Sequence, residues 1–570
     1  MSKRFIGKFL TTVLFLGVFT TGAFADVMQE WVATYNGPGN TVDQAKKMAV
    51  DAEGNVYVTG TSGGSTSDWL DLNNDIVTIK YNSAGEKLWE RRYNGPGGAG
   101  DGGTAIAVDG DGNVYVAGYS SKMWFGEWGK LEYVTIKYNS NGDEVWIRQY
   151  APSWHWYNYP VGIGVGSNGD VYVAGTSPYV VGDSDIVTFK YDSDGVMKWM
   201  RAYDGPGGDD YASAMTVDAG GNVYIAGTSG DRYASRASYN YGILKYDTDG
   251  VLQWVAAYGG TGSEDVPSAI AVDANGNVYV TGRGRVEADY DYATVKFDSG
   301  GIQQWVARYS ATAGGGVDIP TAIAIDSGGN VYVTGYSGDP ARYTTIKYDT
   351  DGTQLWLKEY IGPGELGDVA TSLVLDNDGN AYVTGYSHGG TTGYDFATIK
   401  YWPDGTEEWV ERYNGSGNGD DYSNAIAIDK AGNVYVAGGS YGTSANLDYT
   451  VIKYSPVIVV MVDIKPGSYP NSMNLDSTGV IPVSILSTSD FDARNIDPLT
   501  VKFGPAGATE AHGMGHIEDV NADGLLDIIL HFNTAETGIQ EGETSASLTG
   551  KTLDGKNIIG SDSIRIVGKR

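Results

Sequence analysis

The chain has no cysteine among its 570 residues. This absence excludes disulfide bonds, thiolate metal sites and anchoring through a lipid-modified cysteine. Long apolar runs are also missing beyond the N-terminus, so no membrane-spanning helix is expected after the first 25 residues. Positive charge is scarce, with 38 Lys and Arg against 70 Asp and Glu and a formal net charge of −32. We therefore expect neither nucleic acid nor an anionic membrane as a partner, because both require a basic surface.

The N-terminus has the composition of a secretory signal peptide. Three basic residues precede an apolar stretch over residues 9–19, and Ala23-Phe24-Ala25 fits an A-x-A cleavage site. We expect residues 1–25 to be removed on export, and the mature protein to be secreted to the periplasm or the extracellular space, with attachment to the cell surface left open. Packing alone must then hold the exported protein together, and a large repeat domain buries enough surface for this.

An internal repeat is the most informative feature of the chain. A GN(V/A)Y core recurs at a spacing of 50 to 58 residues, and one copy carries Asp170 in place of the asparagine. The other copies are at Asn55, Asn113, Asn222, Asn277, Asn330, Asn380 and Asn433. A period of this length predicts a propeller, a solenoid or an array.

Each repeat contains four short segments typical of β-strands. They are an apolar run ending in Asp, a segment like NVYVTG, a segment like TIKY, and a Trp followed four residues later by Tyr. Successive side chains of NVYVTG point to opposite faces and both faces carry packing residues, so each sheet should be covered on both sides. Radially stacked propeller blades of four strands provide such cover.

The two ends of the array predict how a ring would close. Trp31–Tyr35 is a fourth strand without its first three, and the last repeat ends at Val451–Tyr454 without a Trp strand. Together the two fragments complete one blade, and closure removes both free sheet edges. The sequence therefore predicts an all-β fold with an eight-bladed β-propeller over residues 26–455, and a seven-bladed ring is the alternative. Eight repeat tryptophans agree with eight blades: Trp31, Trp89, Trp146, Trp199, Trp254, Trp305, Trp356 and Trp409.

With its pattern GNVYVTG…TIKY…G…W, the chain resembles the bacterial SBBP β-propeller repeat family over roughly residues 30–455. The resemblance implies a secreted or cell-surface propeller and implies no reaction.

A second domain is expected where the repeat pattern stops. From Asp463 the sequence reads DIKPGSYPNSMN, then TGVIPVSILST and DPLTVKFG, and no Trp follows Trp409. Residues 456–570 are predicted to form a small β-sandwich. This part resembles a module found at the C-terminus of secreted bacterial proteins, marked by IKPGS…GVIPV…DVNxDGxxD.

The predicted sandwich contains a motif with calcium-ligand spacing. The segment reads D-x-N-x-D-G-x-x-D, with side-chain oxygens at positions 1, 3, 5 and 9, a carbonyl at 7 and Gly at 6 for the turn. The predicted calcium ligands are Asp519, Asn521, Asp523, the carbonyl of Leu525, and Asp527. Position 12 is Leu530 rather than an acid, so the loop departs from an EF-hand. An ordinary hairpin turn is the structural alternative.

Several other motifs are better explained by structure than by chemistry. Three G-x-S-x-G strings, at residues 60–64, 385–389 and 438–442, end the second strand of a repeat and lack the strand–turn–helix context of a nucleophile elbow. Segments such as DGDGN between strands fit tight hairpins. His512 and His516 lie four residues apart, but two glycines break any helix that would align them, so we expect a loop and no metal pair.

Aromatic residues outside the repeat pattern gather in three consecutive loops of blades 1 to 3. Exposed aromatic clusters mark recognition surfaces, and Trp and Tyr faces beside Asp and Asn suit sugar rings. The structural alternative is that these residues pack the long loops onto each other or against the C-terminal sandwich. The predicted ligand-binding residues are Trp69, Trp124, Phe125, Trp128, Trp154, Trp156 and Tyr157, and Tyr159 and Tyr179 adjoin them.

Nothing in the sequence singles out a catalytic base, nucleophile or cofactor cradle. We therefore predict a secreted, monomeric, non-catalytic propeller that binds a glycan or an extracellular protein, with structural calcium in its C-terminal domain. Two alternatives stay open. One is a propeller enzyme acting on polysaccharide, as a lyase or a glycosidase, and the other is an architectural component of the cell envelope or matrix.

Overall fold

Two compact units make up the computed structural model. One is Gln29–Ser455, and the other is built on Pro456–Arg570. The predicted signal peptide lies outside the described residues apart from its last position. The structure describes residues 25–63, 74–96, 100–124, 127–151, 158–178, 184–206, 208–231, 238–259, 264–286, 289–311, 316–442 and 446–567.

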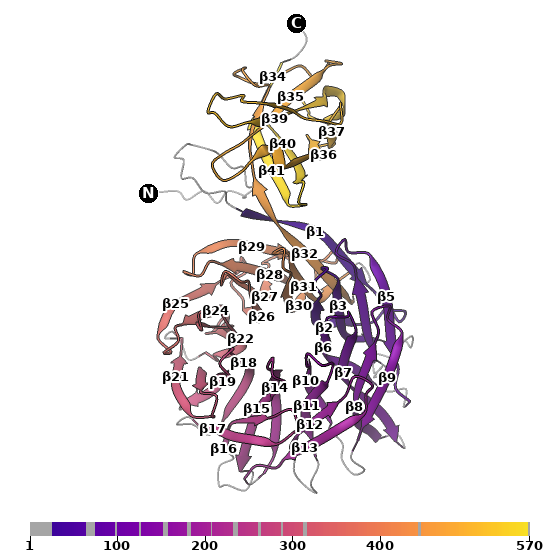
Figure 1. The fold of residues 1–570 in the computed structure, drawn as a ribbon, viewed down its shortest axis with the longest axis vertical. Helices are drawn as coiled ribbons and strands as arrows, with labels where there is room; N and C mark the ends of the chain where they lie inside the picture. The colour runs from indigo at the N-terminus through magenta and orange to yellow at the C-terminus, as the bar shows by residue number, and fades with distance from the viewer. Residues whose placement is uncertain are drawn as a thin grey trace. The chain divides into compact units, whose positions relative to one another are not determined.

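The first unit is a succession of antiparallel four-stranded sheets, each made of consecutive strands. Figure 1 shows these sheets following one another around a ring. The first strands are β2 (Asp43–Val50), β6 (Asp101–Val108), β10 (Tyr159–Val165), β14 (Asp210–Val217), β18 (Asp265–Val272), β22 (Ile319–Ile325), β26 (Asp368–Leu375) and β30 (Tyr422–Ile428). The second strands are β3 (Val56–Gly63), β7 (Val114–Trp124), β11 (Val171–Ser177), β15 (Val223–Asp231), β19 (Val278–Val286), β23 (Val331–Ser337), β27 (Ala381–His388) and β31 (Val434–Tyr441).

The third and fourth strands complete these sheets. The third strands are β4 (Asn74–Tyr81), β8 (Glu127–Tyr138), β12 (Asp185–Tyr191), β16 (Ser238–Tyr246), β20 (Asp289–Phe297), β24 (Arg342–Tyr348), β28 (Tyr394–Tyr401) and β32 (Leu447–Val459). The fourth strands are β5 (Lys87–Tyr93), β9 (Glu144–Tyr150), β13 (Met197–Tyr203), β17 (Leu252–Tyr258), β21 (Gln303–Tyr309), β25 (Gln354–Tyr360) and β29 (Glu407–Tyr413). The last repeat has no fourth strand of its own, and β1 (Ala25–Tyr35) pairs with β32, as predicted for Trp31–Tyr35.

The repeated V-D-x-x-G-N-x-Y signature forms the turn between first and second strands. In the first repeat, Asp51 accepts hydrogen bonds from the backbone and side chain of Asn55 and from the Tyr57 hydroxyl, at 2.8 Å each. The glycine before the asparagine has φ of +76°, a conformation that favours glycine. The aspartates of these turns are therefore occupied by the hairpin, which confirms the hairpin interpretation.

Hydrophobic cores lie between successive sheets. Val56, Tyr57 and Val58 are all fully buried, so both faces of the second strand are covered, as the sequence predicts. Tyr57 shares one core with Val114 and Val116 of the next repeat. Each sheet is thus completed by its neighbour, which is the packing of propeller blades.

The repeat tryptophan links each sheet to the next. Trp89 lies between Tyr57 of its own sheet and Tyr138 of the following one, with ring centroids 6.2 and 6.1 Å away. Its indole N–H donates to the carbonyl of Ser140 at 3.2 Å, and Lys80 donates to the same carbonyl at 3.3 Å. One turn carbonyl therefore receives two donors from the preceding repeat.

The same arrangement joins the last repeat to the first. Trp31 and Lys453 both donate to the carbonyl of Ser83, at 3.1 and 3.2 Å. Trp31 lies between Tyr435 and Tyr81, with ring centroids 6.2 and 6.4 Å away. Residues from the two ends of the array thus supply one complete inter-repeat contact.

The second unit contains two sheets with one shared hydrophobic core. One sheet has the order β33-β35-β39-β38, with β33 (Met461–Ile464), β35 (Val480–Leu486), β39 (Asp527–Asn533) and β38 (His516–Glu518). The other places the end of β32 beside β41 (Asn557–Ser563), β40 (Ser545–Thr552), β36 (Ile496–Phe503) and β37 (Ala508–Thr509). The strands β34 (Ser472–Met473) and β42 (Arg565–Ile566) pair separately.

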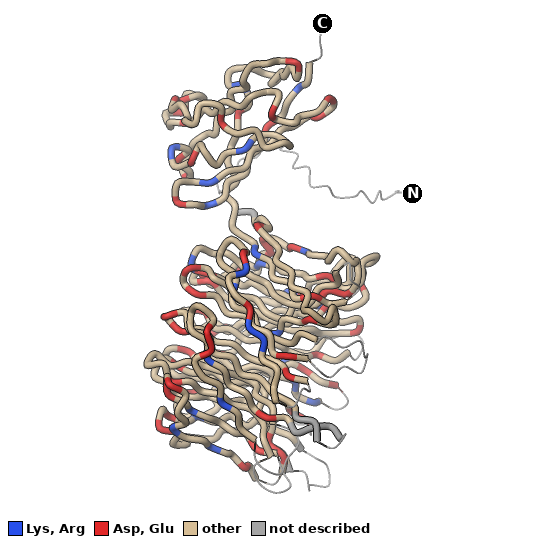
Figure 2. Tube along the Cα trace, turned by 90° about the vertical axis from the view of Figure 1, so that its right-hand side faces the viewer, with Lys and Arg blue, Asp and Glu red and all other residues tan. Residues whose placement is uncertain are grey.

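Helix is almost absent from the described residues. Its two short segments are 3₁₀ turns, η1 (Ala493–Asn495) and η2 (Thr534–Glu536). Nowhere in the described part of the chain is a helix long and apolar enough to cross a membrane. Figure 2 shows Asp and Glu residues at many of the turns.

Candidate functional site

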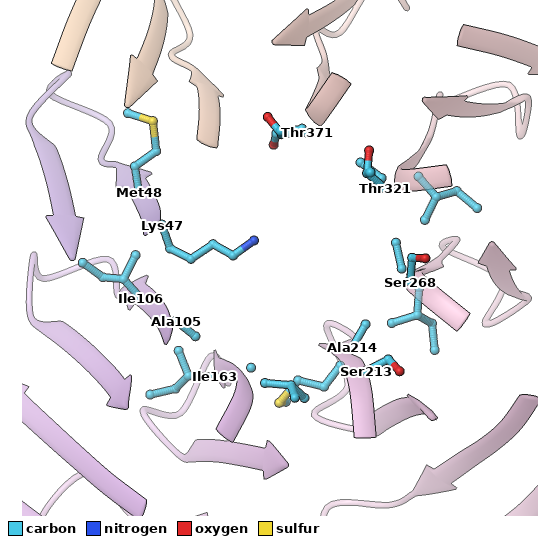
Figure 3. A pocket seen from close by; sticks show the side chains of 18 residues that line it. Lys47, Met48, Ala105, Ile106, Ile163, Ser213, Ala214, Ser268, Thr321 and Thr371 are labelled. Atoms are coloured by element: carbon cyan, nitrogen blue, oxygen red, sulfur yellow. The ribbon is translucent and has the colours of Figure 1, made fainter. Parts of the chain in front are cut away.

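The first strands of successive repeats line a central cavity of about 310 Å³ in the first unit. Small hydroxyl side chains such as Ser213, Ser268 and Thr321 lie on one side of it, and apolar ones such as Ile106 and Ile163 lie on another (Figure 3). A cavity with this lining offers hydroxyl groups for hydrogen bonding and little charge.

A β-bulge in every first strand shapes this lining. The register shifts at the same place in all eight first strands, and bulges re-aim a side chain. The hydroxyl groups of Thr321 and Thr371, both at bulges, donate to carbonyls of the next repeat at 2.9 Å. Asn424 of the last repeat donates in the same way to Ala45 of the first, at 2.8 Å. These polar side chains already hold neighbouring sheets together, so a ligand that binds them would have to break these hydrogen bonds.

Lys47 is the one titratable side chain among the described residues lining the cavity. Figure 3 shows it reaching toward the middle of the opening. Desolvation by the surrounding walls lowers the pKa of Lys47, although part of the residue remains exposed. The described lining contains no carboxylate, histidine or tyrosine that could act with it as an acid–base partner.

The seven predicted ligand-binding aromatics, from Trp69 to Tyr157, lie outside the residues whose side chains the structure describes. Tyr159, which adjoins them, is described and begins β10. Its ring stacks on Tyr119 with centroids 5.1 Å apart and an interplanar angle of 27°, and 44% of its surface is exposed. The residue before it, Asn158, is buried and donates to the Leu131 carbonyl at 2.6 Å. A partly exposed aromatic ring therefore lies at the start of β10, packed on Tyr119 and next to a buried, hydrogen-bonded residue.

A second aromatic cluster at the same end of the sheets was not found by sequence reasoning. Tyr386, Tyr394 and Tyr422 meet with ring centroids 4.9 to 5.9 Å apart. These tyrosines fall at the ends of β27, β28 and β30, within the repeat pattern, where a sequence count of off-pattern tryptophans does not detect them.

The serines of the three G-x-S-x-G strings lie in strands, as predicted. Ser62, Ser387 and Ser440 are buried in β3, β27 and β31. Ser387 accepts a hydrogen bond from Arg412 at 2.7 Å, and Ser62 accepts one from Arg92 at 2.6 Å. Buried strand serines tied to arginine are structural and have no nucleophile-elbow geometry.

Buried carboxyl groups occur where first and third strands begin. Asp185, Asp204 and Asp210 bring one carboxylate oxygen each within 4.8 Å of the others, and two of the three are buried. Burial raises the pKa of Asp210 to about 6, and the charges of Asp185 and Asp204 contribute, while hydrogen bonds from Gly205 and Ser229 oppose the rise. The charge of Asp210 therefore changes with pH at a place where the sheets that contain β12 and β14 meet.

The predicted calcium ligands divide into exposed and buried groups. Asp519 accepts from the backbone N–H groups of Asp523 and Gly524 at 3.1 Å, which curls the loop into a tight turn. Asp527 is fully buried and accepts from Ser487 and Val520 at 2.7 and 2.9 Å. Both Asp527 oxygens thus anchor the backbone, whereas Asp519 is half-buried and Asn521 and Asp523 are exposed.

The expectation that His512 and His516 form no metal pair does not match the geometry. A ligand nitrogen of each lies within 4.8 Å of the other and of His531. A loop and the two paired strands β38 and β39 bring the three side chains together, so the absence of a helix does not separate them. The spacing argument considered only one helix and missed the cross-strand neighbour.

Comparison with known proteins supports the repeat assignment. A family model described as SBBP, a β-propeller repeat, matches residues 30–65, 92–122, 253–286, 304–340, 356–390 and 408–444. SBBP repeats are thus present in six places, and with the repeated four-stranded sheets they give a β-propeller fold.

One curated relative is the Regulatory protein FlaEY of Caulobacter vibrioides, which is 31% identical over 160 residues. The match covers 25% of this chain, and the chain spans only 16% of that protein.

Solved structures with a similar course include Sqt1 of Chaetomium thermophilum bound to the N-terminus of the ribosomal protein L10. It is 11% identical with a TM-score of 0.48, and the match covers 74% of this chain and 99% of that one. A polysaccharide lyase of family PL25, an ulvan lyase, is 10% identical with a TM-score of 0.37 and covers 60% of this chain and 90% of its own. At these identities and TM-scores neither likeness carries a functional assignment.

The raised pKa of Asp210 predicts a pH-dependent cost to folding. A carboxyl group whose pKa is higher in the folded state contributes stability below its unfolded pKa and loses that contribution as the pH rises through 6. Relative to D210N, the wild-type protein should therefore lose about 1.4 kcal/mol of unfolding free energy between pH 5 and pH 8, the equivalent of one pKa unit. Urea unfolding of both proteins in EDTA measures this difference.

The matched control is D194N, because Asp194 is an exposed aspartate outside this group. Its difference from the wild type should change much less with pH. A gap between wild type and D210N that stays constant from pH 5 to pH 8 would contradict the raised pKa.

Proposed function

We propose that the chain is a secreted, monomeric, non-catalytic β-propeller that recognises a glycan through the aromatic loops of its first three repeats. The observation that carries this proposal is Tyr159, an exposed ring held on Tyr119 beside the segment that contains Trp154 and Trp156. Sugar rings stack on rigid aromatic faces and bond through their hydroxyl groups. A preformed platform requires little ordering on binding, which favours affinity.

The proposed scaffold is an eight-bladed ring. The shared Ser83 carbonyl supports it, because Trp31 and Lys453 take the positions that Trp89 and Lys80 take between the first two repeats. The two sheets around one core support a C-terminal β-sandwich as a second domain. In this arrangement the ring is a rigid platform, and the loops carry recognition.

The lining of the central cavity supports a non-catalytic role over the alternative of a polysaccharide-degrading enzyme. A glycosidase uses two carboxyl groups that flank the scissile bond. The described lining offers Lys47 and hydroxyl groups that hold neighbouring sheets together, with no acid.

Binding of polysaccharides to the mature chain tests the proposal. A panel of neutral and basic polysaccharides should include one that produces a saturable change in tryptophan fluorescence. The triple variant W124A/W154A/W156A should lose this binding, and Y159A should weaken it, because both remove stacking faces. The matched control is Y394A, which removes a tyrosine from the other cluster.

Thermal unfolding separates binding from packing in the same variants. If the triple variant binds no glycan and unfolds at the wild-type temperature, the loops form a recognition surface. A large loss of thermal stability in that variant would instead assign these tryptophans to packing between loops. No response to any glycan would direct the search to an extracellular protein partner or an architectural role.

We further propose that the Asp519–Asp527 loop binds calcium as a structural ion. Asp519, Asn521 and Asp523 supply side-chain oxygens in a loop already curled by their own backbone contacts. Oxygen ligands at this spacing suit a hard cation. The buried Asp527 supports the proposal as the anchor that holds both ends of the loop in place.

Calcium should therefore stabilise the second unit. At a free concentration a hundredfold above Kd, the gain in unfolding free energy is about 2.7 kcal/mol for one site. Calorimetry with calcium and with EDTA should show this gain in the wild type and not in D519N/D523N. The control D490N changes an exposed acid of the same unit outside the loop. An equal calcium response in D519N/D523N would reject the site.

A further inference from the structure

Three of the five histidines in the chain converge at one place in the second unit. His512, His516 and His531 each offer a ring nitrogen within 4.8 Å of the other two. Their ring centroids are 5.2 Å apart for His512 and His531, 5.4 Å for His516 and His531, and 6.5 Å for His512 and His516. These separations allow three imidazoles to point at a common atom.

Strand pairing places two of the three side chains on one face. His516 of β38 lies opposite Ile529 of β39, so His531 is its diagonal neighbour two residues along. Side chains two residues apart in a strand share a face, and diagonal neighbours on a sheet are within reach of each other. The sheet therefore fixes the relative positions of His516 and His531.

Two glycines allow the loop between His512 and His516 to pass close to β39, so that His512 lies near the other two histidines. Gly513 has φ of +70°, which a residue with a side chain rarely adopts. A Cβ atom at Gly515 would lie 2.4 Å from Cδ1 and Cγ1 of Ile528, so only glycine allows the loop to pass so close to β39. The H-G-M-G-H sequence is thus needed to fold the two histidines over the strand.

A buried glutamate orients the cluster. Only 1% of the Glu510 side chain is exposed, and it accepts from the backbone N–H groups of His512 and His531 at 2.6 and 3.2 Å. Its Oε1 lies 3.5 Å from Nδ1 of His512. A carboxylate beside the second ring nitrogen is the usual support of a metal-bound histidine, and it leaves Nε2 of His512 for a ligand.

His531 provides an independent indication of a ligand. Its Nδ1 is buried and has no hydrogen-bond partner among the described residues. A ring nitrogen that keeps a free lone pair is the group with which histidine binds a metal.

We propose that His512, His516 and His531 form a site for Zn²⁺, with a fourth position open to water or an external ligand. Three histidines and one open position are a known coordination set for zinc, and imidazole prefers zinc and its neighbours over calcium. The zinc site is separate from the proposed calcium loop, whose ligands are oxygens, although both adjoin the β38–β39 hairpin.

Titration of the full mature chain with Zn²⁺ against a chromophoric zinc indicator tests this site. The wild type should bind one equivalent and rise in unfolding temperature. H512Q/H516Q should lose that equivalent and the temperature rise, because both changed side chains are exposed and the fold should be retained. H388Q, which changes a described histidine outside the cluster, should behave as the wild type.

Co²⁺ gives a second readout, since a three-histidine site should produce visible absorption bands that H512Q/H516Q lacks. Calcium should still stabilise H512Q/H516Q. The zinc and calcium proposals can therefore be tested, and can fail, independently of each other. Glycan binding in the first unit should be unaffected. Absence of zinc binding by the wild type, or one equivalent still bound by H512Q/H516Q, would overturn the proposal.

Discussion

An indole N–H that donates to a turn carbonyl of the following repeat is the interaction on which the first unit depends. It recurs at about 3.0 to 3.2 Å from seven tryptophans, namely Trp31, Trp89, Trp146, Trp199, Trp254, Trp305 and Trp356. Each tryptophan also covers a turn glycine, and at Gly85 a Cβ atom would lie 2.6 Å from Cδ2 of Trp31. Glycine in the turn and tryptophan in the preceding repeat are therefore one constraint, which explains why both recur with the same period.

Many polar side chains of the first unit also have a structural role. Threonine and asparagine side chains at the bulges connect successive sheets around the cavity, and the aspartates of the hairpins bind their own turns. The proposed sites use positions that the repeat does not need, namely Tyr159 in the first unit and the three histidines in the second.

The architecture of the first unit can be predicted from its sequence because one sequence pattern recurs eight times. Strand order, turn type and the role of Trp31 can all be predicted, since each depends on residues close in the sequence or on the period. The candidate sites are less accessible to this reasoning. Tyr119 and Tyr159 meet across two sheets, and His531 reaches His516 through strand register, so neither contact leaves a local pattern. The spacing of His512 and His516 was compared only with that of a helix, which gives no indication that His531 lies beside them.

The two ends of the array complete one sheet, in which β1 pairs with β32, and closure of the proposed ring depends on this pairing. Hydrogen exchange of the mature protein, followed by mass spectrometry, measures this without any mutation. Amides of residues 30–35 in β1 should exchange as slowly as those of residues 89–93 in β5, because both strands occupy the same position in their sheets. Fast exchange of residues 30–35 beside slow exchange of residues 89–93 would show an unpaired N-terminal strand and contradict the closed ring.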